Sequence, residues 1–354
     1  MASTSEAVWS EQGTTPDAIE AALRELLIQR HAENDSFVPA RVLNMIAFVD
    51  RAWSGEIANR LRGVGRYHAS RLVVLSYEPR REQLDARVMV ASEGEPTPGE
   101  LALLRETVVV EIGDRHLDDL LTIADPLVVT DLPTLLWSPH GHHDVLETLL
   151  ALSQAVLLDS VEEPIASEAL ERAWALTEDA YVVDLAWLRS TPWRERIAAA
   201  FDPPALREEL QRLSSVTVRH HPASTAAAML MVGWLSSRLG WEPQALIADG
   251  EALAGTARAR REQVRLRLET APGMQVPGLD SVSLETSSGL ALSLGRGVGG
   301  LRGRWRDRHG QEREWTIAGA SRGEAGVLGE GIRQALLRDP TYVPALELAR
   351  RLPA

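Results

Sequence analysis

The strongest constraint on the fold is the alternation of two hydrophobic patterns along the first 160 residues. Short apolar runs rich in β-branched residues are typical of buried strands, and they fall at residues 41–49, 72–77, 86–91, 107–112, 127–130, 135–137 and 155–159. Segments with apolar residues at helical spacing lie between them, at residues 56–62, 117–123 and 144–152. An earlier helix is predicted to open at Thr15, because a hydroxyl cap precedes Pro16 and Asp17. This alternation predicts an α/β layer with helices packed on a sheet.

The pattern changes after residue 160. An acidic pair and a proline at residues 160–166 predict a domain boundary. Beyond it the sequence predicts helices at 167–177, 192–201 and 226–239 and strands at 181–188 and 216–219. Thr191 is the expected cap of the second of these helices, and Gly240 is expected to end the third.

The last ninety residues predict a different arrangement from the alternating strands and helices before them. Short strands separated by glycine-rich turns are predicted at 264–268, 281–284, 290–294, 301–306 and 313–317, followed by helices at 325–338 and 343–352. We therefore predict an α/β protein of two domains. They are a flexible N-terminus at 1–14, an N-terminal α/β domain at 15–162, and a C-terminal domain at 163–354 of mixed α+β type that ends in an antiparallel meander and two helices.

The net charge and the absence of two residue types limit the partners and reactions that are possible for this chain. The chain carries 37 basic and 50 acidic residues, a net charge of −13, which disfavours nucleic acid and anionic membrane surfaces as partners. It has no cysteine, and therefore no disulfide, thiolate nucleophile or cysteine-ligated metal. It also has no lysine, which excludes Schiff-base chemistry and a P-loop lysine.

The N-terminus predicts no targeting segment. Its first 17 residues contain neither the basic region nor the apolar run of a signal peptide. No stretch approaches the roughly 18 apolar residues of a membrane-spanning helix. We expect a cytoplasmic protein.

Two motifs resemble ligand sites but have simpler interpretations. Gly295, Gly297 and Gly300 match G-x-G-x-x-G, yet a basic, strand-like run follows where a dinucleotide site requires a helix, so a hairpin loop is the prediction. His140, His142 and His143 could bind a metal together with Asp144, but their spacing matches no helical metal motif. A loop in which Asp144 caps the next helix is favoured, and we predict neither metal nor cofactor. The pair His220-His221 is a similar but weaker candidate for a metal site.

The segment GRYHASR at residues 65–71 is a candidate anion site. Its candidate ligands are two guanidiniums, two hydroxyls and an imidazole, on Arg66, Tyr67, His68, Ser70 and Arg71. Such groups after glycines can hold a phosphate or a carboxylate. The alternative is a polar loop whose arginines pair with the many acids of the chain.

Two further motifs place an aspartate before an apolar run with tryptophan. They are DLPTLLW, with Asp131 and Trp137, and DLAWLRSTPWR, with Asp184, Trp187, Trp193 and Arg194. Tryptophan and arginine are enriched at protein interfaces, which makes these residues candidate partner contacts. The equally weighted alternative is a core tryptophan with an aspartate capping a turn. No catalytic triad or nucleophile elbow is present, which favours a protein that is not an enzyme.

At these motifs the chain resembles the OpcA family, the glucose-6-phosphate dehydrogenase assembly proteins of actinobacteria and cyanobacteria. The matching segments run in order as RVLNMIAFV (41–49), GRYHASRLVVL (65–75), DPLVVTDLPTLLW (125–137), LLDS (157–160), DLAWLRSTPWRE (184–195) and MLMVGWLSSRLGW (229–241). The all-arginine basic set suits an actinobacterial source.

The resemblance implies a non-catalytic accessory protein that binds glucose-6-phosphate dehydrogenase, promotes its active oligomer and raises its activity in the oxidative pentose phosphate pathway. It supplies no catalytic residues, and it leaves self-association open. Thioredoxin-type control through cysteines, known for cyanobacterial members, cannot act on this cysteine-free chain. The alternative function is a sugar-phosphate- or nucleotide-binding enzyme, or a metabolite sensor, with an anion site at Arg66 and Arg71.

Overall fold

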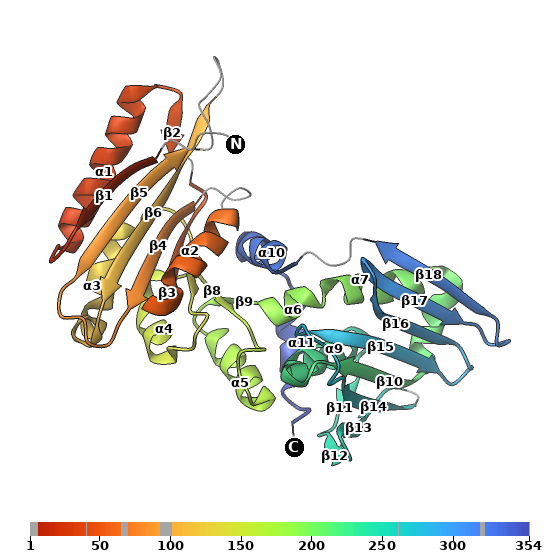
Figure 1. Ribbon diagram of the computed structural model, residues 1–354. Helices are drawn as coiled ribbons and strands as arrows, with labels where there is room; N and C mark the ends of the chain where they lie inside the picture. Colours follow the sequence, from red (N-terminus) through yellow and green to blue (C-terminus); the bar gives the residue numbers. More distant parts are fainter. Residues whose placement is uncertain are drawn as a thin grey trace. The chain divides into compact units, whose positions relative to one another are not determined.

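The computed structural model describes residues 6–39, 41–64, 70–92, 101–260, 262–318 and 323–353 (Figure 1). Its contacts divide the chain into two units. The first comprises Met1–Leu158, Asp179–Val183 and Leu328–Leu337, and the second comprises Asp159–Glu178, Asp184–Val327 and Arg338–Ala354. Each unit is built on its own nine-stranded sheet with helices packed against it. The predicted two-part α/β fold is confirmed.

The first sheet is mainly parallel at its centre. Its strands are β1 (Glu6–Glu11), β2 (Phe37–Pro39), β3 (Leu43–Asp50), β4 (Ser70–Tyr77), β5 (Asp85–Ser92), β6 (Ala102–Ile112), β7 (Thr134–Trp137), β8 (Ala155–Leu158) and β9 (Tyr181–Asp184). They lie in the order β1-β5-β6-β4-β3-β7-β8-β9, with β2 beside β6. Strands β6, β4, β3, β7 and β8 run parallel. Residues 43–49 of β3 are all buried, as expected for a parallel strand covered on both faces.

The helices of the first unit are α1 (Pro16–Glu33), α2 (Arg51–Val64), α3 (Leu120–Ala124) and α4 (His143–Leu149), with short 3-10 turns at Asp114–Asp119, Asp125–Leu127 and Leu150–Leu152. Helix α1 starts where the sequence predicts, because the Thr15 hydroxyl accepts a hydrogen bond from the backbone amide of Ala18.

The strand predicted at 127–130 is wrong. The buried side chain of Asn44 bonds both the amide and the carbonyl of Val129, each at 2.9 Å, in place of a neighbouring strand.

The second sheet is mostly antiparallel, in the order β11-β13-β14-β10-β15-β16-β17-β18, with β12 beside β13. Its strands are β10 (Leu213–His220), β11 (Glu242–Pro243), β12 (Ile247–Asp249), β13 (Ala252–Arg258), β14 (Gln263–Thr270), β15 (Leu279–Thr286), β16 (Ala291–Gly297), β17 (Gly300–Arg306) and β18 (Glu312–Ala318). The antiparallel meander is confirmed from β15 to β18. It does not extend back to β14, because β10 lies between β14 and β15.

The helices of the second unit are α5 (Ala166–Leu176), α6 (Leu185–Arg189), α7 (Thr191–Phe201), α8 (Pro204–Arg207), α9 (Thr225–Leu239) and α11 (Tyr342–Ala349), with 3-10 turns at Glu208–Arg212 and Pro222–Ser224. Helix α10 (Gly323–Leu337) passes into the first unit from Leu328 onward. Helix α9 is buried all round from Ala226 to Ser236, since it packs on β10 and β14 and also on α11 and α5. It ends at Gly240 in the left-handed conformation (φ 68°), as predicted.

The strand predicted at 181–188 is half correct. It ends at Asp184, whose carboxylate accepts the backbone amide of Ala186 at 2.9 Å and thereby starts α6. The cap assigned to Thr191 is also wrong, since α7 is preceded by Ser190. The Thr191 hydroxyl accepts a hydrogen bond from the Arg194 guanidinium at 2.9 Å.

Candidate functional site

The described part of the GRYHASR segment is Ser70 and Arg71, at the start of β4, while Arg66, Tyr67 and His68 lie outside the described residues. Arg71 is buried, and its Nε donates to a carboxylate oxygen of Glu106 on β6 at 2.7 Å. Its Nη1 donates to the carbonyl of Leu127 at 3.2 Å. Arg41 Nε donates to the second oxygen of Glu106 at 2.5 Å. The Arg71 guanidinium is therefore engaged within the first unit by a buried carboxylate.

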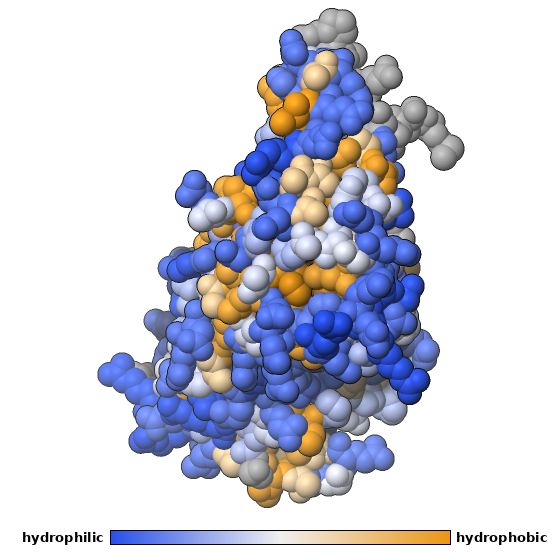
Figure 2. Space-filling view, turned by 90° about the vertical axis from the view of Figure 1, so that its left-hand side faces the viewer, coloured by the Kyte–Doolittle hydropathy of each residue, from blue (hydrophilic) through white to orange (hydrophobic). Residues whose placement is uncertain are grey.

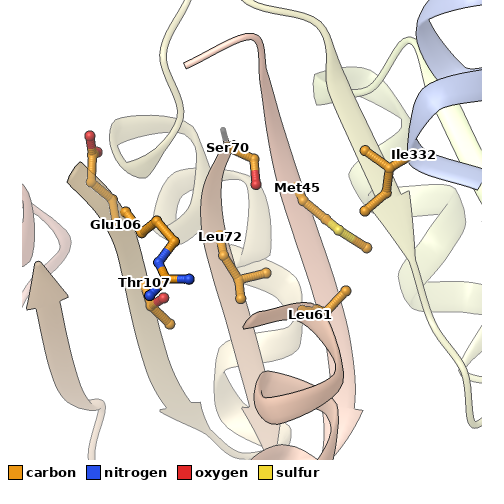
Figure 3. Close-up of a pocket in the computed structure, with 8 residues that line it drawn as sticks. Met45, Leu61, Ser70, Leu72, Glu106, Thr107 and Ile332 are labelled. Carbon is orange, nitrogen blue, oxygen red and sulfur yellow. The ribbon is translucent and has the colours of Figure 1, made fainter. Parts of the chain in front are cut away.

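A small depression adjoins this ion-pair cluster. It has a volume of about 20 Å³ and is lined by Met45, Leu61, Ser70, Leu72, Arg105, Glu106, Thr107 and Ile332. In Figure 3 the Glu106 carboxylate points away from the apolar side chains on the other side of the depression. This volume suits about one water molecule and is too small for a sugar phosphate.

The second unit brings three predicted residues together around a buried polar cluster. Asp184 is buried, and its carboxylate accepts the Ser160 amide at 3.2 Å and the Tyr342 hydroxyl at 3.4 Å. The indole of Trp187 donates to Asp339 at 2.8 Å. The Arg194 guanidinium lies 3.4 Å from the centre of the Trp187 ring and donates to the carbonyl of that residue. The cluster joins α6 and α7 to the segment that leads into α11.

Burial shifts the pKa values of two side chains in this cluster. It lowers the pKa of Arg194 to about 10, a shift that Asp339 opposes, so the guanidinium stays charged at neutral pH. It raises the pKa of Asp184 to about 6, with the nearby charge of Asp159 adding to the shift. Asp159 itself forms a two-pronged ion pair with Arg189, at 2.8 and 2.7 Å. These side chains hold helices to one another inside the unit.

We predict that Asp184→Asn flattens the dependence of stability on pH. A carboxyl group with a raised pKa binds its proton more tightly in the folded protein than in the unfolded chain. Its contribution is complete below about pH 4 and is lost as the pH rises through about 6, a change of about 3 kcal/mol. Asparagine can keep the backbone bonds through its oxygen and donate to Ser160 through its amide nitrogen.

Urea unfolding between pH 4 and pH 8 measures the effect. The wild type should lose free energy of unfolding over this range relative to the Asp184→Asn variant. Asp202→Asn, at an exposed carboxylate, is the matched control and should follow the wild type. Parallel curves for wild type and Asp184→Asn would contradict the raised pKa.

The predicted tryptophan contacts lie inside the units. Trp137, at the end of β7, is 4% exposed, and Trp187 and Trp193 are 2% and 4% exposed, whereas Asp131 is exposed in the turn before β7. Among the ten tryptophans the exposed one is Trp53, at 49%. The sequence gives no sign of this difference, because tryptophan serves equally in cores and at surfaces.

The topology of the first sheet brings together residues that the sequence analysis did not combine. Its central order β6-β4-β3-β7-β8 is the doubly wound arrangement, in which the chain reverses direction across the sheet between β3 and β7. Ligands of such sheets bind at the carboxyl ends of the strands near that point. Here the edge carries an open depression of about 650 Å³ lined by Asp50, Arg51, Ala52, Trp53, Tyr77, Glu78 and Pro79.

The histidine segment after β7 adjoins the same edge. His142 lies 2.9 Å from the carboxylate of Asp50, and its ring packs against Tyr77 with centroids 5.5 Å apart. The ring of His140 lies against Trp53 at 5.8 Å, and burial lowers the pKa of His140. His142 itself precedes α4 with a left-handed backbone (φ 56°), so the predicted capping role of Asp144 is wrong and Asp144 lies inside the first turn.

Two polar contacts fix the other side chains at this edge. The Tyr77 hydroxyl donates to Asp114, and this bond, together with burial, raises the pKa of Tyr77 to about 12. Arg51 and Glu78 form an ion pair at 2.6 Å, which lowers the pKa of Glu78. The phenol therefore stays protonated and committed to Asp114 at neutral pH. The edge presents an aromatic ring between charged groups.

The β3–α2 connection lacks the features of a dinucleotide site. Helix α2 begins at Arg51, directly after the last residue of β3, and no glycine-rich turn opens it. The G-x-G-x-x-G match lies in the other unit, where Gly297 and Gly300 pair across the β16–β17 hairpin, as predicted. The side chains of Arg51 and Trp53 line the open depression at this connection.

Three observations concern the surface, the described helices and possible metal ligands. Figure 2 shows one face on which apolar side chains form separate patches between hydrophilic ones. None of the described helices is long and apolar enough to cross a membrane. Across the described residues, no three His, Asp or Glu side chains are grouped so that they could hold a metal ion.

Fold and site together define a class: a two-unit α/β protein with a doubly wound sheet that lacks a dinucleotide turn. Two family models match almost consecutive parts of the chain, the glucose-6-phosphate dehydrogenase subunit N-terminal domain over residues 62–174 and the C-terminal domain of the same subunit over residues 180–346. The chain belongs to the OpcA family.

Curated relatives carry the same family name. The OxPP cycle protein OpcA of Synechococcus elongatus is 28% identical over 150 residues, which cover 41% of this chain and 34% of that protein. The OpcA protein of Nostoc punctiforme is 33% identical over 121 residues, covering 33% of this chain and 26% of that protein. The matches thus span a quarter to a third of the relatives' length.

Solved structures resemble the chain only loosely. An oxidoreductase domain protein from Kribbella flavida gives a TM-score of 0.46 at 12% identity, covering 87% of this chain and 94% of that one. A dehydrogenase (MviM) from Clostridium difficile gives 0.45 at 9% identity, covering 87% and 97%. A likeness of this level supports no conclusion about activity.

Proposed function

We propose that this protein is a non-catalytic accessory protein that binds glucose-6-phosphate dehydrogenase, promotes its active oligomer and raises its activity in the oxidative pentose phosphate pathway. The match of both subunit domains, over residues 62–174 and 180–346, carries the proposal. The curated relatives are named for the OxPP cycle, which agrees with it. In this proposal the protein acts in the cytoplasm.

The geometry of the described residues favours binding over catalysis. The depression beside Glu106 holds about one water, and Arg71 is paired there with a carboxylate. An anion site built on Arg66 and Arg71, which a sugar-phosphate enzyme or sensor would use, gains no support from this pairing. The larger depression at the edge of β3 and β4 is open and presents a half-exposed tryptophan, as binding surfaces do.

We place the dehydrogenase contact at this open edge, around Trp53 and Arg51. A partner shifts an enzyme toward its active state only if it binds that state more tightly. Large aromatic side chains supply such preference because they bury much area at little entropic cost. Trp137, Trp187 and Trp193 are buried, so in this proposal they are core residues of their own units and not contacts, and Asp131 remains an exposed candidate.

The proposal predicts co-elution and activation. Purified protein mixed with its cognate dehydrogenase should elute with it in size-exclusion chromatography and should raise kcat or lower KM. Trp53→Ala should weaken binding at least about 10-fold, in the range of interface anchors. Ile28→Ala, which removes another exposed apolar side chain, is the matched control and should bind as the wild type does.

Co-elution and enzyme kinetics together show whether the proposed function or only the proposed contact surface is wrong. No co-elution and no kinetic effect at micromolar concentrations would end the proposed function. Normal activation by the Trp53→Ala variant would instead leave the function intact and move the contact to another surface.

A further inference from the structure

One face of the second sheet carries small and charged side chains in three aligned rows. Residues alternate between the two faces of a strand, and paired residues share a face. The middle row, from β13 to β18, is Ala254, Arg267, Thr217, Ser283, Ser293, Arg304 and Glu314. The flanking rows are Thr256, Arg265, Ser215, Glu285, Ala291, Arg306 and Glu312, and Ala252, Glu269, Arg219, Ser281, Gly295, Arg302 and Thr316. We call this surface the row face.

The opposite face is the one that the helices cover. Its side chains, such as Val216, Leu284 and Leu292, are buried, and Phe201 of α7 packs there against Trp305 of β17 with ring centroids 5.6 Å apart. No residue of the three rows has a large apolar side chain. The row face thus lies on the side of the sheet away from the helix-covered core.

The centre of the row face is built for close approach. On β10, β15 and β16 most row residues are serine, threonine, alanine or glycine, and the hydroxyls of Ser283 and Ser293 bond each other at 2.9 Å. Soluble proteins usually carry long charged side chains on an exposed sheet face, which keep other sheets away. Short side chains let a second sheet pack at the ordinary spacing of about 10 Å.

Opposite charges flank this centre. On one side β14 carries Arg265 and Arg267, and on the other β18 carries Glu312 and Glu314. Arg267 is paired with Asp249, and Glu314 with Arg304 at 2.7 Å. Arg265 and Glu312 are exposed and form no ion pair with another described residue. In the strand order, β14 and β18 are each the third strand from the line between β15 and β16.

We propose that the row face is a homodimer interface, in which two copies of this chain pack face to face about a two-fold axis parallel to the strands, between β15 and β16. This axis places β14 of one copy over β18 of the other. Arg265 then faces Glu312 of the second copy, and Arg267 faces Glu314. Each contact occurs twice, as in every isologous interface.

Among the remaining oppositions, one brings like charges together. Ser283 faces Ser293 of the second copy near the axis, and Thr217 faces Arg304. Arg219 faces Arg302, but its charge is offset within the chain by Glu269 at 3.6 Å and Asp280 at 3.4 Å. Sheets that pack face to face keep their strands within about 30° of each other, so these oppositions hold approximately.

The size of the row face fits a stable dimer. Six strands about 4.8 Å apart, each about seven residues long at about 3.3 Å per residue, give roughly 650 Å² of sheet. Side chains at the rim add to this figure. Standard interfaces bury about 800 Å² on each partner.

Charge reversal with mixing tests the proposal. Light scattering after size-exclusion chromatography should give the wild type twice its chain mass of 38.8 kDa. Arg265→Glu and Glu312→Arg should each raise the dissociation constant of the dimer about 30-fold, because two attractive oppositions become repulsive in each homodimer. An equimolar mixture of the two variants should dimerise again, because each reversed charge then meets its opposite.

A variant at the axis keeps the test independent of the charges. Ser283→Glu brings two carboxylates together near the axis and should raise the dissociation constant at least about 100-fold. Arg24→Glu, on the exposed surface of α1, is the control and should leave the mass unchanged. Melting temperatures of all variants check that the monomers fold.

The outcomes separate this surface from the dehydrogenase contact. Monomeric wild type, a dimer that resists Ser283→Glu, or variants that stay monomeric when mixed would each overturn the proposal. A monomeric wild type whose Arg265→Glu variant loses the dehydrogenase would also overturn it, because the row face would then bind that enzyme. Trp53→Ala should leave the dimer intact even if it abolishes activation.

Discussion

Gly233→Ala should destabilise the second unit by about 3 kcal/mol or more, the upper range for overpacking. Gly233 lies in α9 where that helix crosses α11. A Cβ atom at this position would stand 2.1 Å from the carbonyl oxygen of Ala345 and 2.9 Å from the amide of Ala349. Both atoms belong to backbone, so they cannot turn aside as a flexible side chain would. The two helices would have to separate.

The same substitution at Gly55 provides the matched control. Gly55 is exposed in α2 and a Cβ there would contact nothing within 4 Å. Gly55→Ala should therefore stabilise the protein by about 0.5–1 kcal/mol through helix propensity. Urea unfolding followed by circular dichroism measures both changes. Equal effects of the two substitutions would refute the tight α9–α11 crossing.

Glu106→Gln should cost about 3–5 kcal/mol, as expected when one partner of a buried ion pair is removed. The side chain of Glu106 is 1% exposed and serves Arg71 and Arg41 together. Glutamine keeps the shape but leaves the buried Arg71 guanidinium without a counter-charge. The free energy of urea unfolding gives the size of the loss.

Glu20→Gln is the control for this substitution. Glu20 pairs with Arg24 one turn away on the exposed side of α1, where such a pair contributes about 0.3 kcal/mol. If Glu106→Gln also changed the free energy of unfolding by only about 0.3 kcal/mol, the buried Arg71–Glu106 ion pair would not be present as described. Arg71 would then have another acceptor. Arg71→Met combined with Glu106→Leu should recover part of the loss, since the apolar pair removes both buried charges and leaves only Arg41, whose side chain is 21% exposed, without this carboxylate.

Local signals predicted the elements whose ends are fixed by neighbouring residues. The start of α1 depends on Thr15 and Pro16, and the end of α9 depends on Gly240. The β16–β17 hairpin follows from its glycines. In each case the physical cause lies within a few residues, and the sequence displays it directly.

Long-range pairing produced two of the differences. Residues 127–130 have the composition of a strand, but the side chain of Asn44, more than 80 positions earlier, takes the hydrogen bonds a neighbouring strand would supply. In the same way β10 enters the sheet between β14 and β15, which breaks the predicted continuous meander. Neither partner can be identified from local composition.

In the candidate site, too, the sequence indicated some residues directly, while others are brought there only by the fold. The histidine segment at 140–143 stood out in the sequence, but its neighbours Asp50 and Trp53 did not, because the doubly wound order alone brings the end of β3 beside the end of β7. A signal did exist. The order of alternating strands and helices predicts a sheet whose carboxyl edge gathers the residues that follow each strand.

The path of the chain between the two units has a consequence for its synthesis. After Leu158 the chain enters the second unit, returns to the first for Asp179–Val183, and returns again for Leu328–Leu337. On the ribosome, the first unit therefore cannot be completed when its own continuous stretch has emerged. It must wait for residue 337, by which point most of the second unit has also been made. We therefore expect the two units to finish folding nearly together, late in translation, and a nascent chain of the first 160 residues to be a client for chaperones.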